Sequence, residues 1–288
     1  MYQLLPGLLF AALWASASVA TKFGVQSVHP LILANVRFFI AGSGMLLFAY
    51  GIQRSKNPWP TAIEWRQLTI FALLNTTIYL GAFVLALKEV SAGIGSLSTA
   101  TNPLFIAMLS ALWLRRRPSW NEIGGLLLGL FGVGIATYPL LQNSYATLSG
   151  LLILLVGMIS VSAATVYYAS IEWRLPSLVI NGWQVFLGGL LLTPFTLLTA
   201  DFSASHYDIR FWASVIWLIV PVSIAALQLW FYLVRQDAIR ASLWLFLCPI
   251  FGFAYSYLLM GEPITIYTVV GTALVIGGLW LGRKASAK

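Results

Sequence analysis

The side chains of this sequence that could perform chemistry are mostly neutral, and they lie inside long apolar runs. They are hydroxyl, amide and aromatic groups, which bind a ligand by hydrogen bonds or by the faces of their rings. The set consists of Tyr79, Asn75, Ser98, Thr101, Asn102, Tyr167, Gln228, Trp230 and Trp244. Together they predict a neutral pocket with aromatic walls, suited to a zwitterionic or apolar molecule. For each residue alone, a hydrogen bond between two helices is the alternative, since such groups often link membrane helices.

Arg37 is the only clear charge within one of these apolar runs. Along a helix it lies about 9 Å from Leu31, at about 1.5 Å per residue, so its head group can reach outward or meet a partner within the protein. Two interpretations remain open. Arg37 would contact the carboxylate of a ligand or form an outer gate, or it would be a structural tether to backbone carbonyls.

The sequence does not place the residues needed for proton binding, metal binding or nucleophilic catalysis within its apolar runs. The acidic residues fall in loops or at the ends of apolar runs, which argues against a buried carboxylate that binds a proton or a cation. They are Glu64, Glu89, Glu122, Glu172, Asp201, Asp208, Asp237 and Glu262. His29 and His206 are predicted in loops and Cys248 is the single cysteine, so no metal cluster, disulfide or activated nucleophile is indicated. We therefore expect no metal, no cofactor and no enzymatic activity.

Pro103 and Pro249 fall near the middle of two apolar runs. A proline inside a helix removes a backbone donor and clashes with the preceding turn, so it bends the helix and frees a carbonyl. Such bends would serve as hinges, and the freed carbonyls would bind an ammonium group. A static kink is the alternative, because proline is common in membrane helices.

Composition identifies the elements that must position these groups. Apolar residues make up 60% of the chain, charged residues 8%, and the mean hydropathy is +0.88. Soluble domains carry about a quarter charged residues, so we predict an all-α integral membrane protein. Apolar runs of about 20 residues match transmembrane helices, whereas barrel strands would alternate in character. Ten helices are predicted, over residues 4–21, 31–52, 68–87, 92–114, 123–138, 148–171, 178–198, 211–234, 241–260 and 264–281.

The second half of the chain repeats the first at one spacing. Several Pro, Asn and Gly residues recur 146 positions later, and the apolar runs follow in the same order. The pairs are Pro30 and Pro176, Asn35 and Asn181, Gly42 and Gly188, Pro103 and Pro249, Gly125 and Gly271, and Gly132 and Gly278. Because each half has five predicted helices, the second half must enter the membrane from the opposite face. We expect two inverted repeats, residues 1–145 and 146–288.

Lys and Arg are unequally distributed between the two predicted membrane faces. The face shared by both termini carries twelve of them, and the opposite face carries three, namely Lys22, Lys88 and Arg210. By the positive-inside rule, both termini are expected in the cytoplasm. The net charge of +8 arises in these loops and does not indicate a nucleic-acid partner. The predicted surroundings are the lipid bilayer.

Short motifs in the predicted helices are similar to those of one transporter family. They are Asn102-Pro103, Cys248-Pro249, the glycine-rich fifth and tenth helices, and Gly261-Glu262-Pro263. Over essentially its whole length the chain resembles the EamA branch of the drug/metabolite transporter (DMT) superfamily. It departs from that family at Arg115-Arg116-Arg117-Pro118, where an acidic residue is usual, and this puts any role of that acid in doubt. The resemblance implies a multi-pass protein of the bacterial cytoplasmic (inner) membrane.

Resemblance and residues together predict a function. Tyr79 and Trp230 stand where aromatic amino-acid exporters of this family carry aromatic residues. We expect a secondary transporter that exports small neutral or zwitterionic metabolites, amino acids first, by alternating access through a central cavity. The alternatives are a passive facilitator or channel for small solutes and a membrane-embedded enzyme.

Small residues mark one face on each of the fifth and tenth helices. They are Gly125 and Gly129, and Gly278 and Gly282. Such faces allow two helices to approach closely, either within the chain or between two copies in a homodimer.

Overall fold

A computed structural model describes residues 4–53, 57–113, 120–142, 146–236, 241 and 243–286. The first half contains α1 (Leu4–Gly24), α2 (Pro30–Leu47), η1 (Phe48–Ile52), α3 (Ala62–Ala72), η3 (Leu73–Ile78), α4 (Tyr79–Glu89), α5 (Ala92–Thr99), α6 (Asn102–Trp113) and α7 (Trp120–Gln142). The second half contains α8 (Leu148–Ala169), α9 (Ser177–Thr199), α10 (Ile209–Trp217), η4 (Leu218–Ala226), α11 (Leu227–Gln236), η5 (Leu243–Leu247), α13 (Cys248–Met260) and α14 (Ile266–Ser286). The expected all-α fold is confirmed for these residues, among which the only β-pairing is an isolated bridge between Val90 and Ala146.

Seven helical stretches in the described part are long and apolar enough to cross a membrane. They are Leu5–Gly24, Pro30–Ile52, Ala62–Glu89, Ala92–Trp113, Leu148–Ala169, Ser177–Thr199 and Ile209–Gln236. Three shorter apolar helices span Ile123–Ala136, Trp244–Met260 and Ile266–Gly278. Every predicted range therefore contains a helix, and the chain is a multi-pass membrane protein. The count of ten crossings and their directions remain predictions.

Polar residues explain where several helices begin. The Thr61 hydroxyl accepts a hydrogen bond from the Glu64 N–H, and the Glu64 carboxylate accepts one from the Thr61 N–H, so a capping box starts α3. This cap places the start of the third helix at Ala62, before the predicted residue 68. The same role falls to Ser91, Thr147 and Asp208, which cap α5, α8 and α10.

The third and eighth predicted helices each contain a π-helical segment, η3 and η4, and the second ends in another, η1. Shifted by the 146-residue spacing, η3 falls within η4. Pro221 within η4 has no N–H and cannot close an α-helical bond. Neighbouring helices supply donors to carbonyls of both segments, because Ser160 Oγ donates to Leu74 O at 2.7 Å and Asn181 Nδ2 donates to Ser223 O at 2.8 Å. The sequence analysis did not foresee these segments, which often mark functional sites.

The fourth and ninth predicted helices are interrupted just before their prolines. α5 ends at Thr99 and α6 starts at Asn102, while the 3-10 segment η5 ends at Leu247, directly before α13. Pro103 and Pro249 thus lie in the first turn of α6 and of α13, where a missing N–H breaks no helical bond. The expected bends take the form of helix breaks, and the hinge role remains a prediction.

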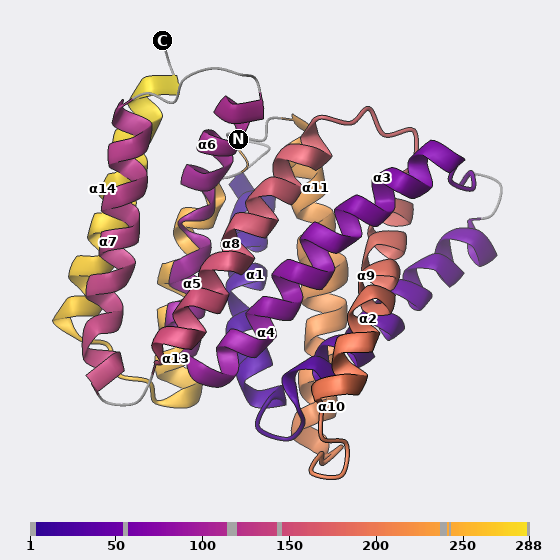
Figure 1. Cartoon of the computed structure of the whole chain (residues 1–288), viewed down its shortest axis with the longest axis horizontal. Helices are drawn as coiled ribbons and strands as arrows, with labels where there is room; N and C mark the ends of the chain where they lie inside the picture. The colour runs from indigo at the N-terminus through magenta and orange to yellow at the C-terminus, as the bar shows by residue number, and fades with distance from the viewer. Residues whose placement is uncertain are drawn as a thin grey trace.

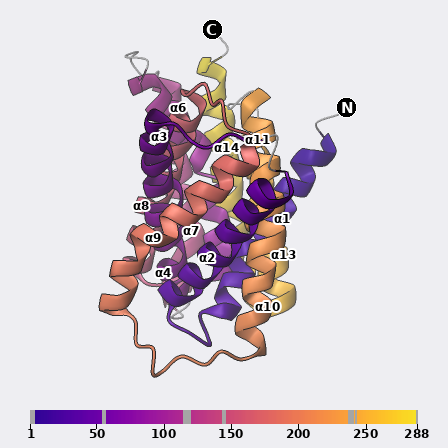
Figure 2. The same ribbon diagram turned by 90° about the vertical axis from the view of Figure 1, so that its right-hand side faces the viewer.

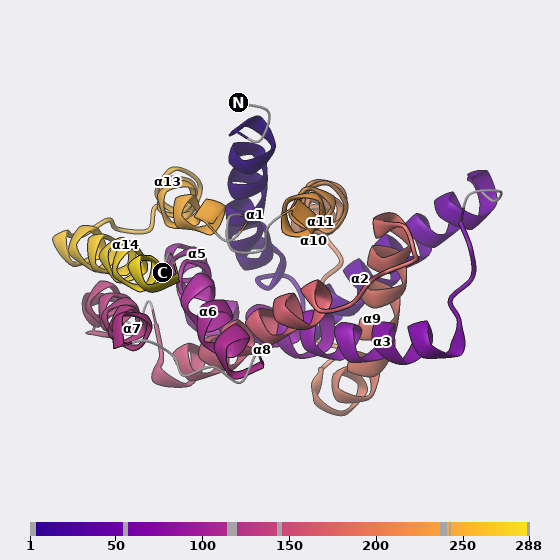
Figure 3. The same cartoon turned by 90° about the horizontal axis from the view of Figure 1, so that it is seen from above.

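Helices of the two halves interleave in one bundle. α2 packs along α9 and α7 packs along α14, so each contacts the helix that the repeat pairs it with. Figure 1 shows α7 and α14 at one edge and α2, α3 and α9 at the other. Seen from above in Figure 3, α1 lies between α13 and the pair α10 and α11. The start of α1 and the end of α14 lie at one end of the bundle (Figure 2), called here the terminal end.

Glycines allow the close contact between α7 and α14. A Cβ atom on Gly278 would lie 2.5 Å from the Gly125 carbonyl oxygen and 2.9 Å from the Gly129 nitrogen. A larger side chain would therefore push the two helices apart. These predicted small-residue faces are used within the chain, while Gly282 lies outside the part whose side chains are described.

Candidate functional site

A small cavity lies in the core between α1, α2, α4, α5 and η4. Its volume is about 10 Å³, room for about one water molecule. Its walls combine one cation, one phenol, one indole and several hydroxyls with apolar side chains. They are Trp14, Ala15, Ala17, Ser18, Arg37, Tyr79, Leu80, Phe83, Ser96, Thr99 and Val222. Two of the predicted site residues, Arg37 and Tyr79, therefore meet at this cavity.

Arg37 is buried at the cavity with 3% of its surface exposed. Its Nε donates to Ser223 Oγ at 2.9 Å, and its guanidinium carbon lies 5.7 Å from the centre of the Phe38 ring. No carboxylate lies within 4 Å of this guanidinium in the described part of the chain. A buried cation without an acidic partner favours an anionic group beside it, because the paired charges are less costly to bury.

Other predicted polar residues of the first half are buried and bonded within the protein. Ser98 Oγ donates to Gly95 O, and Thr101 Oγ1 donates to Ser98 O, each at 2.7 Å. Asn75 Nδ2 donates to Gln184 Oε1 at 3.2 Å. None of these three predicted residues is among the side chains that line the cavity around Arg37.

Two of the predicted amides are buried with one polar atom unpartnered. Asn102 Oδ1 and Gln228 Nε2 have no hydrogen-bond partner among the described residues. Asn102 begins α6 at the helix break, three residues after the cavity-lining Thr99. Buried polar atoms are nearly always paired, so unpartnered ones indicate a place for water or a polar ligand.

The predicted aromatic residues of the second half lie in a separate core cluster. Trp230 stacks on Phe10 of α1 with ring centres 5.1 Å apart. Trp244 packs on Gly7, where any Cβ would collide with the indole, and Tyr167 packs against the same cluster. The structure therefore divides the predicted wall into two groups and brings only Tyr79 of the aromatic set to Arg37.

Sequence analysis missed most of the cavity wall. Trp14 and Ser18 lie one turn apart on α1, and Ser96 and Thr99 lie one turn apart on α5. Ser18 Oγ and Ser96 Oγ are 2.9 Å apart and form a hydrogen bond between α1 and α5. The available signal was the helical spacing of polar or aromatic residues within an apolar run.

A larger cavity of about 590 Å³ lies between α1, α10 and α13 and contains none of the predicted site residues. Its wall is almost entirely apolar, with Arg210 at the edge near the start of α10 and with Ser16, whose Oγ accepts a hydrogen bond from Trp217 Nε1 at 2.9 Å. Recognition of a small metabolite needs convergent polar groups, which this cavity lacks. The cavity at Arg37 is therefore the better candidate despite its smaller volume.

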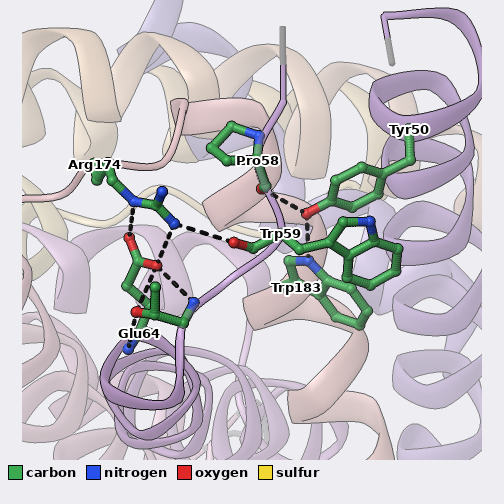
Figure 4. A network of polar contacts seen from close by, with 7 residues as sticks. Tyr50, Pro58, Trp59, Glu64, Arg174 and Trp183 are labelled. Carbon is green, nitrogen blue, oxygen red and sulfur yellow. Dashed lines mark hydrogen bonds and ion pairs between the residues drawn. The ribbon is translucent and has the colours of Figure 1, made fainter. Parts of the chain in front are cut away.

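At the terminal end of the bundle, Arg174 of the α8–α9 loop joins the two halves of the chain (Figure 4). Its Nη2 lies 2.9 Å from the Glu64 carboxylate and donates to Trp59 O at 3.1 Å. Trp183 Nε1 donates to the Tyr50 hydroxyl at 3.1 Å, and Tyr50 stacks on Trp59. These contacts close the bundle at this end.

At the opposite end, two charged side chains bind helix ends. Lys22 Nζ donates to the carbonyls of Leu87 at 2.9 Å and Val90 at 2.6 Å, where α4 ends. Glu262 accepts hydrogen bonds from the N–H groups of Ala92 and Gly93, where α5 begins. Each charge has the sign that the helix dipole favours. The predicted loop position of Glu262 is confirmed, and its side chain is buried.

A family model covers most of the chain. The model described as the EamA-like transporter family matches residues 2–138 and 148–282. This chain belongs to the EamA-like transporter family. The family expectation of the sequence analysis is therefore confirmed, and the EamA-like chain is a membrane transporter.

Relatives of this EamA-like transporter align over nearly its full length. An uncharacterized transporter from Archaeoglobus fulgidus is 27% identical and covers 95% of each chain. One from Synechocystis sp. is 29% identical, over 93% of this chain and 86% of its own. A probable amino-acid metabolite efflux pump of Salmonella typhimurium is 23% identical, over 95% of this chain and 92% of its own.

A solved crystal structure has the same fold as the EamA-like chain. It superimposes with a TM-score of 0.68 and 20% sequence identity, over 99% of this chain and 97% of its own. At this identity the likeness supports the fold alone.

Proposed function

We propose that this transporter exports small neutral or zwitterionic metabolites, amino acids first, by alternating access through the cavity at Arg37. The observation that carries the proposal is the buried Arg37 without an acidic partner, on a wall of neutral and aromatic groups. A substrate carboxylate would complete this site, because Arg binds carboxylates through a planar fork of donors. The name of the Salmonella relative, an amino-acid metabolite efflux pump, agrees with it.

The remaining wall suits the rest of an amino acid. Trp14, Tyr79 and Phe83 offer ring faces to methyl groups, rings or an ammonium. The unpartnered Asn102 Oδ1 lies just after the break in α5, near the negative end of that helix, and would accept a hydrogen bond from the ammonium. A polyanionic substrate would meet only one cation here, so a zwitterion fits better. Pro103 and Pro249, at the two breaks, would be the hinges.

We propose the inverted repeat as the architecture that moves the cavity from one face to the other. The matched π-helical segments, the matched helix breaks and the two stretches that fit the family model support it. The shared end of α1 and α14 supports termini on one side, the cytoplasmic side of the inner membrane by the charge distribution. Contacts at both ends of the bundle, and a cavity with room for about one water molecule, support an occluded state without substrate and argue against an open channel. The cavity at Arg37 would widen to admit an amino acid.

Counterflow in proteoliposomes tests the proposal. Unlabelled amino acids on the inner side should accelerate the uptake of labelled ones, which requires a carrier with alternating access. Arg37→Met should abolish this uptake, because the carboxylate loses its cation, while Arg37→Lys should retain part of it. Absence of counterflow for all twenty amino acids, or full activity of Arg37→Met, would refute the proposed function. Uptake without acceleration by trans substrate would favour a passive facilitator.

A further inference from the structure

One turn of α9 contacts η3 and η4, the π-helical segments that correspond in the two halves of the chain. Asn181 Nδ2 donates to the Ser223 carbonyl in η4 at 2.8 Å. Gln184 Oε1 accepts hydrogen bonds from Asn75 Nδ2 at 3.2 Å and from the Thr76 hydroxyl, both in η3. The two α9 residues are joined to each other, since Gln184 Nε2 donates to Asn181 Oδ1 at 3.1 Å. Gln184 therefore completes a link between the two halves of the chain.

Arg37 is the end of this series of hydrogen bonds at the cavity. Its Nε donates to the hydroxyl of Ser223, the same residue whose carbonyl accepts from Asn181. The series thus runs from the cavity through η4 and α9 to η3. Gln184 and Asn181 are both fully buried, at 0% exposure, so no water replaces a bond that breaks.

The position of this series at π-helical segments suggests what it does. A π-helical turn can revert to an α-helical turn, which shifts the following residues around and along the helix axis. Here such a shift in η3 would move Asn75 and Thr76 away from Gln184, and one in η4 would move Ser223 away from Asn181 and Arg37. A change in either segment therefore frees one of the two α9 amides, and the bond between Gln184 and Asn181 carries that change to the amide that holds the other segment.

We propose that Gln184 is a positioning residue that couples η3 and η4 to each other and to Arg37. The role of this coupling in transport rests on the proposed function, whereas the coupling itself is a property of the fold. A ligand that pulls on Arg37 would loosen η4 and, through Gln184, η3. Both segments would then change together, which an alternating carrier with two repeats requires.

Asn35 provides a matched control for Gln184. Its Nδ2 donates to Thr196 Oγ1 at 2.5 Å, so it is also a buried amide that joins α2 to α9. Among the described residues, its side-chain hydrogen bond goes to α9 and to neither η3 nor η4. Asn35→Leu removes a buried amide hydrogen bond to the same helix, α9, and leaves the coupling series intact.

Cys248 supplies a readout that does not depend on the substrate. It is the single cysteine of the chain, it is buried, and it lies at the start of α13 beside Ala11 of α1. The measurement is the rate at which a membrane-impermeant sulfonated maleimide modifies Cys248 in proteoliposomes. Because Cys248 is buried in this structure, we expect the rate to rise when the bundle opens.

The experiment is a double-mutant cycle with Gln184→Leu and Arg37→Met. Each single variant should raise the rate about five- to tenfold, a typical coupling between sites. The double variant should match a single variant, because both changes break one series, whereas independent changes would multiply. Asn35→Leu should stay within about twofold of the wild type, as an uncoupled site does. Where Gln184→Leu gives no folded protein, Asn181→Ala breaks the same series and takes its place.

Three results would each overturn the proposal. They are effects of the two changes on the labelling rate that multiply in the double variant, an unchanged rate in Gln184→Leu, and a rise in Asn35→Leu equal to that in Gln184→Leu. The last result would indicate general loosening between α2 and α9. Absence of amino-acid counterflow together with the expected labelling pattern would refute the transport function and leave the coupling in place. Normal counterflow, together with labelling rates that multiply in the double variant, would support the transport function and refute the coupling.

Discussion

Glu262 accepts a 2.9 Å hydrogen bond from the backbone N–H of Ala92 and so caps α5 from the other half of the chain. Its second carboxylate oxygen accepts from Gly93 at 3.1 Å. Gly261, with a φ of 65°, ends α13 in the left-handed conformation and turns the chain so that Glu262 follows directly. A motif that looks like a loop signature in the sequence is therefore a contact between two helices.

Glu262→Gln should destabilise the protein by about 1–3 kcal/mol, because a buried charge-assisted cap is lost. The measurement is the midpoint of thermal unfolding in detergent. Glu172→Gln is the control, since Glu172 is exposed and its variant should unfold like the wild type. Equal midpoints for wild type and Glu262→Gln would contradict the prediction.

Gly271→Ala should separate α7 from α14. The new Cβ would collide with the Gly132 carbonyl oxygen and would lie 2.6 Å from the Ala136 side chain. Overpacking of this kind costs about 1–3 kcal/mol, so the yield of monodisperse protein should fall. Gly277→Ala on the same helix meets no atom within 4 Å and should keep the wild-type yield. If Gly271→Ala gave as much monodisperse protein as Gly277→Ala, the prediction would be wrong, and α7 and α14 would be able to move apart at little cost.

Trp230→Ala and Tyr79→Phe should fail in different ways. Trp230 stacks on Phe10 in the core, so its loss leaves a void that costs about 3–5 kcal/mol and lowers the amount of folded protein. Tyr79→Phe keeps the ring at the cavity and removes only the hydroxyl. We expect a normal folded yield but reduced counterflow, because the cavity loses one polar group. Size-exclusion profiles and counterflow on the same samples separate the two. The prediction fails if Trp230→Ala folds well and only its transport is lost.

Acid should loosen the start of α10. The backbone N–H of Phe211 donates to the Asp208 carboxylate at 2.9 Å and, with a smaller effect from Ser27, lowers the pKa of Asp208 below its ordinary value. The stabilisation is therefore complete above the ordinary pKa of about 3.9 and is lost as pH falls through the lower value of the folded state. The protection of amides in the first turn of α10, measured as the exchange rate relative to that of an unstructured peptide at the same pH, should fall below about pH 4. Asp208→Asn keeps a cap that does not titrate and should remove this loss of protection.

The helices were predictable because their signal is local. Apolar runs gave every helical range, and Pro103 and Pro249 marked the two helix breaks. The start of α3 was predicted too late, because the Thr61–Glu64 capping box extends the helix beyond its apolar part. The π-helical segments were not predicted, since apart from Pro221 they leave no pattern in the residues themselves.

The candidate site was predictable only in part, because contacts between helices depend on rotation and crossing angle. Arg37 and Tyr79 were predicted and meet at one cavity, while Trp230 and Trp244 point into a different cluster. Gln184 was missed although an amide in an apolar run is a visible signal. Its partners in η3 come from more than 100 residues away in the chain, and no local pattern indicates them.

The two closures of the bundle respond differently to electrolyte. The Arg174 side chain, which binds Glu64, is 55% exposed, and an attraction between exposed charges is screened by salt, with a Debye length of about 8 Å at 0.15 M. The Glu262 contact is buried and largely escapes this screening. Raising the ionic strength on both sides of the membrane should therefore weaken the contact between Arg174 and Glu64 at the terminal end and leave the Glu262 contact largely unchanged. For the proposed carrier, we therefore expect concentrated salt to favour opening at the terminal end over opening at the opposite end.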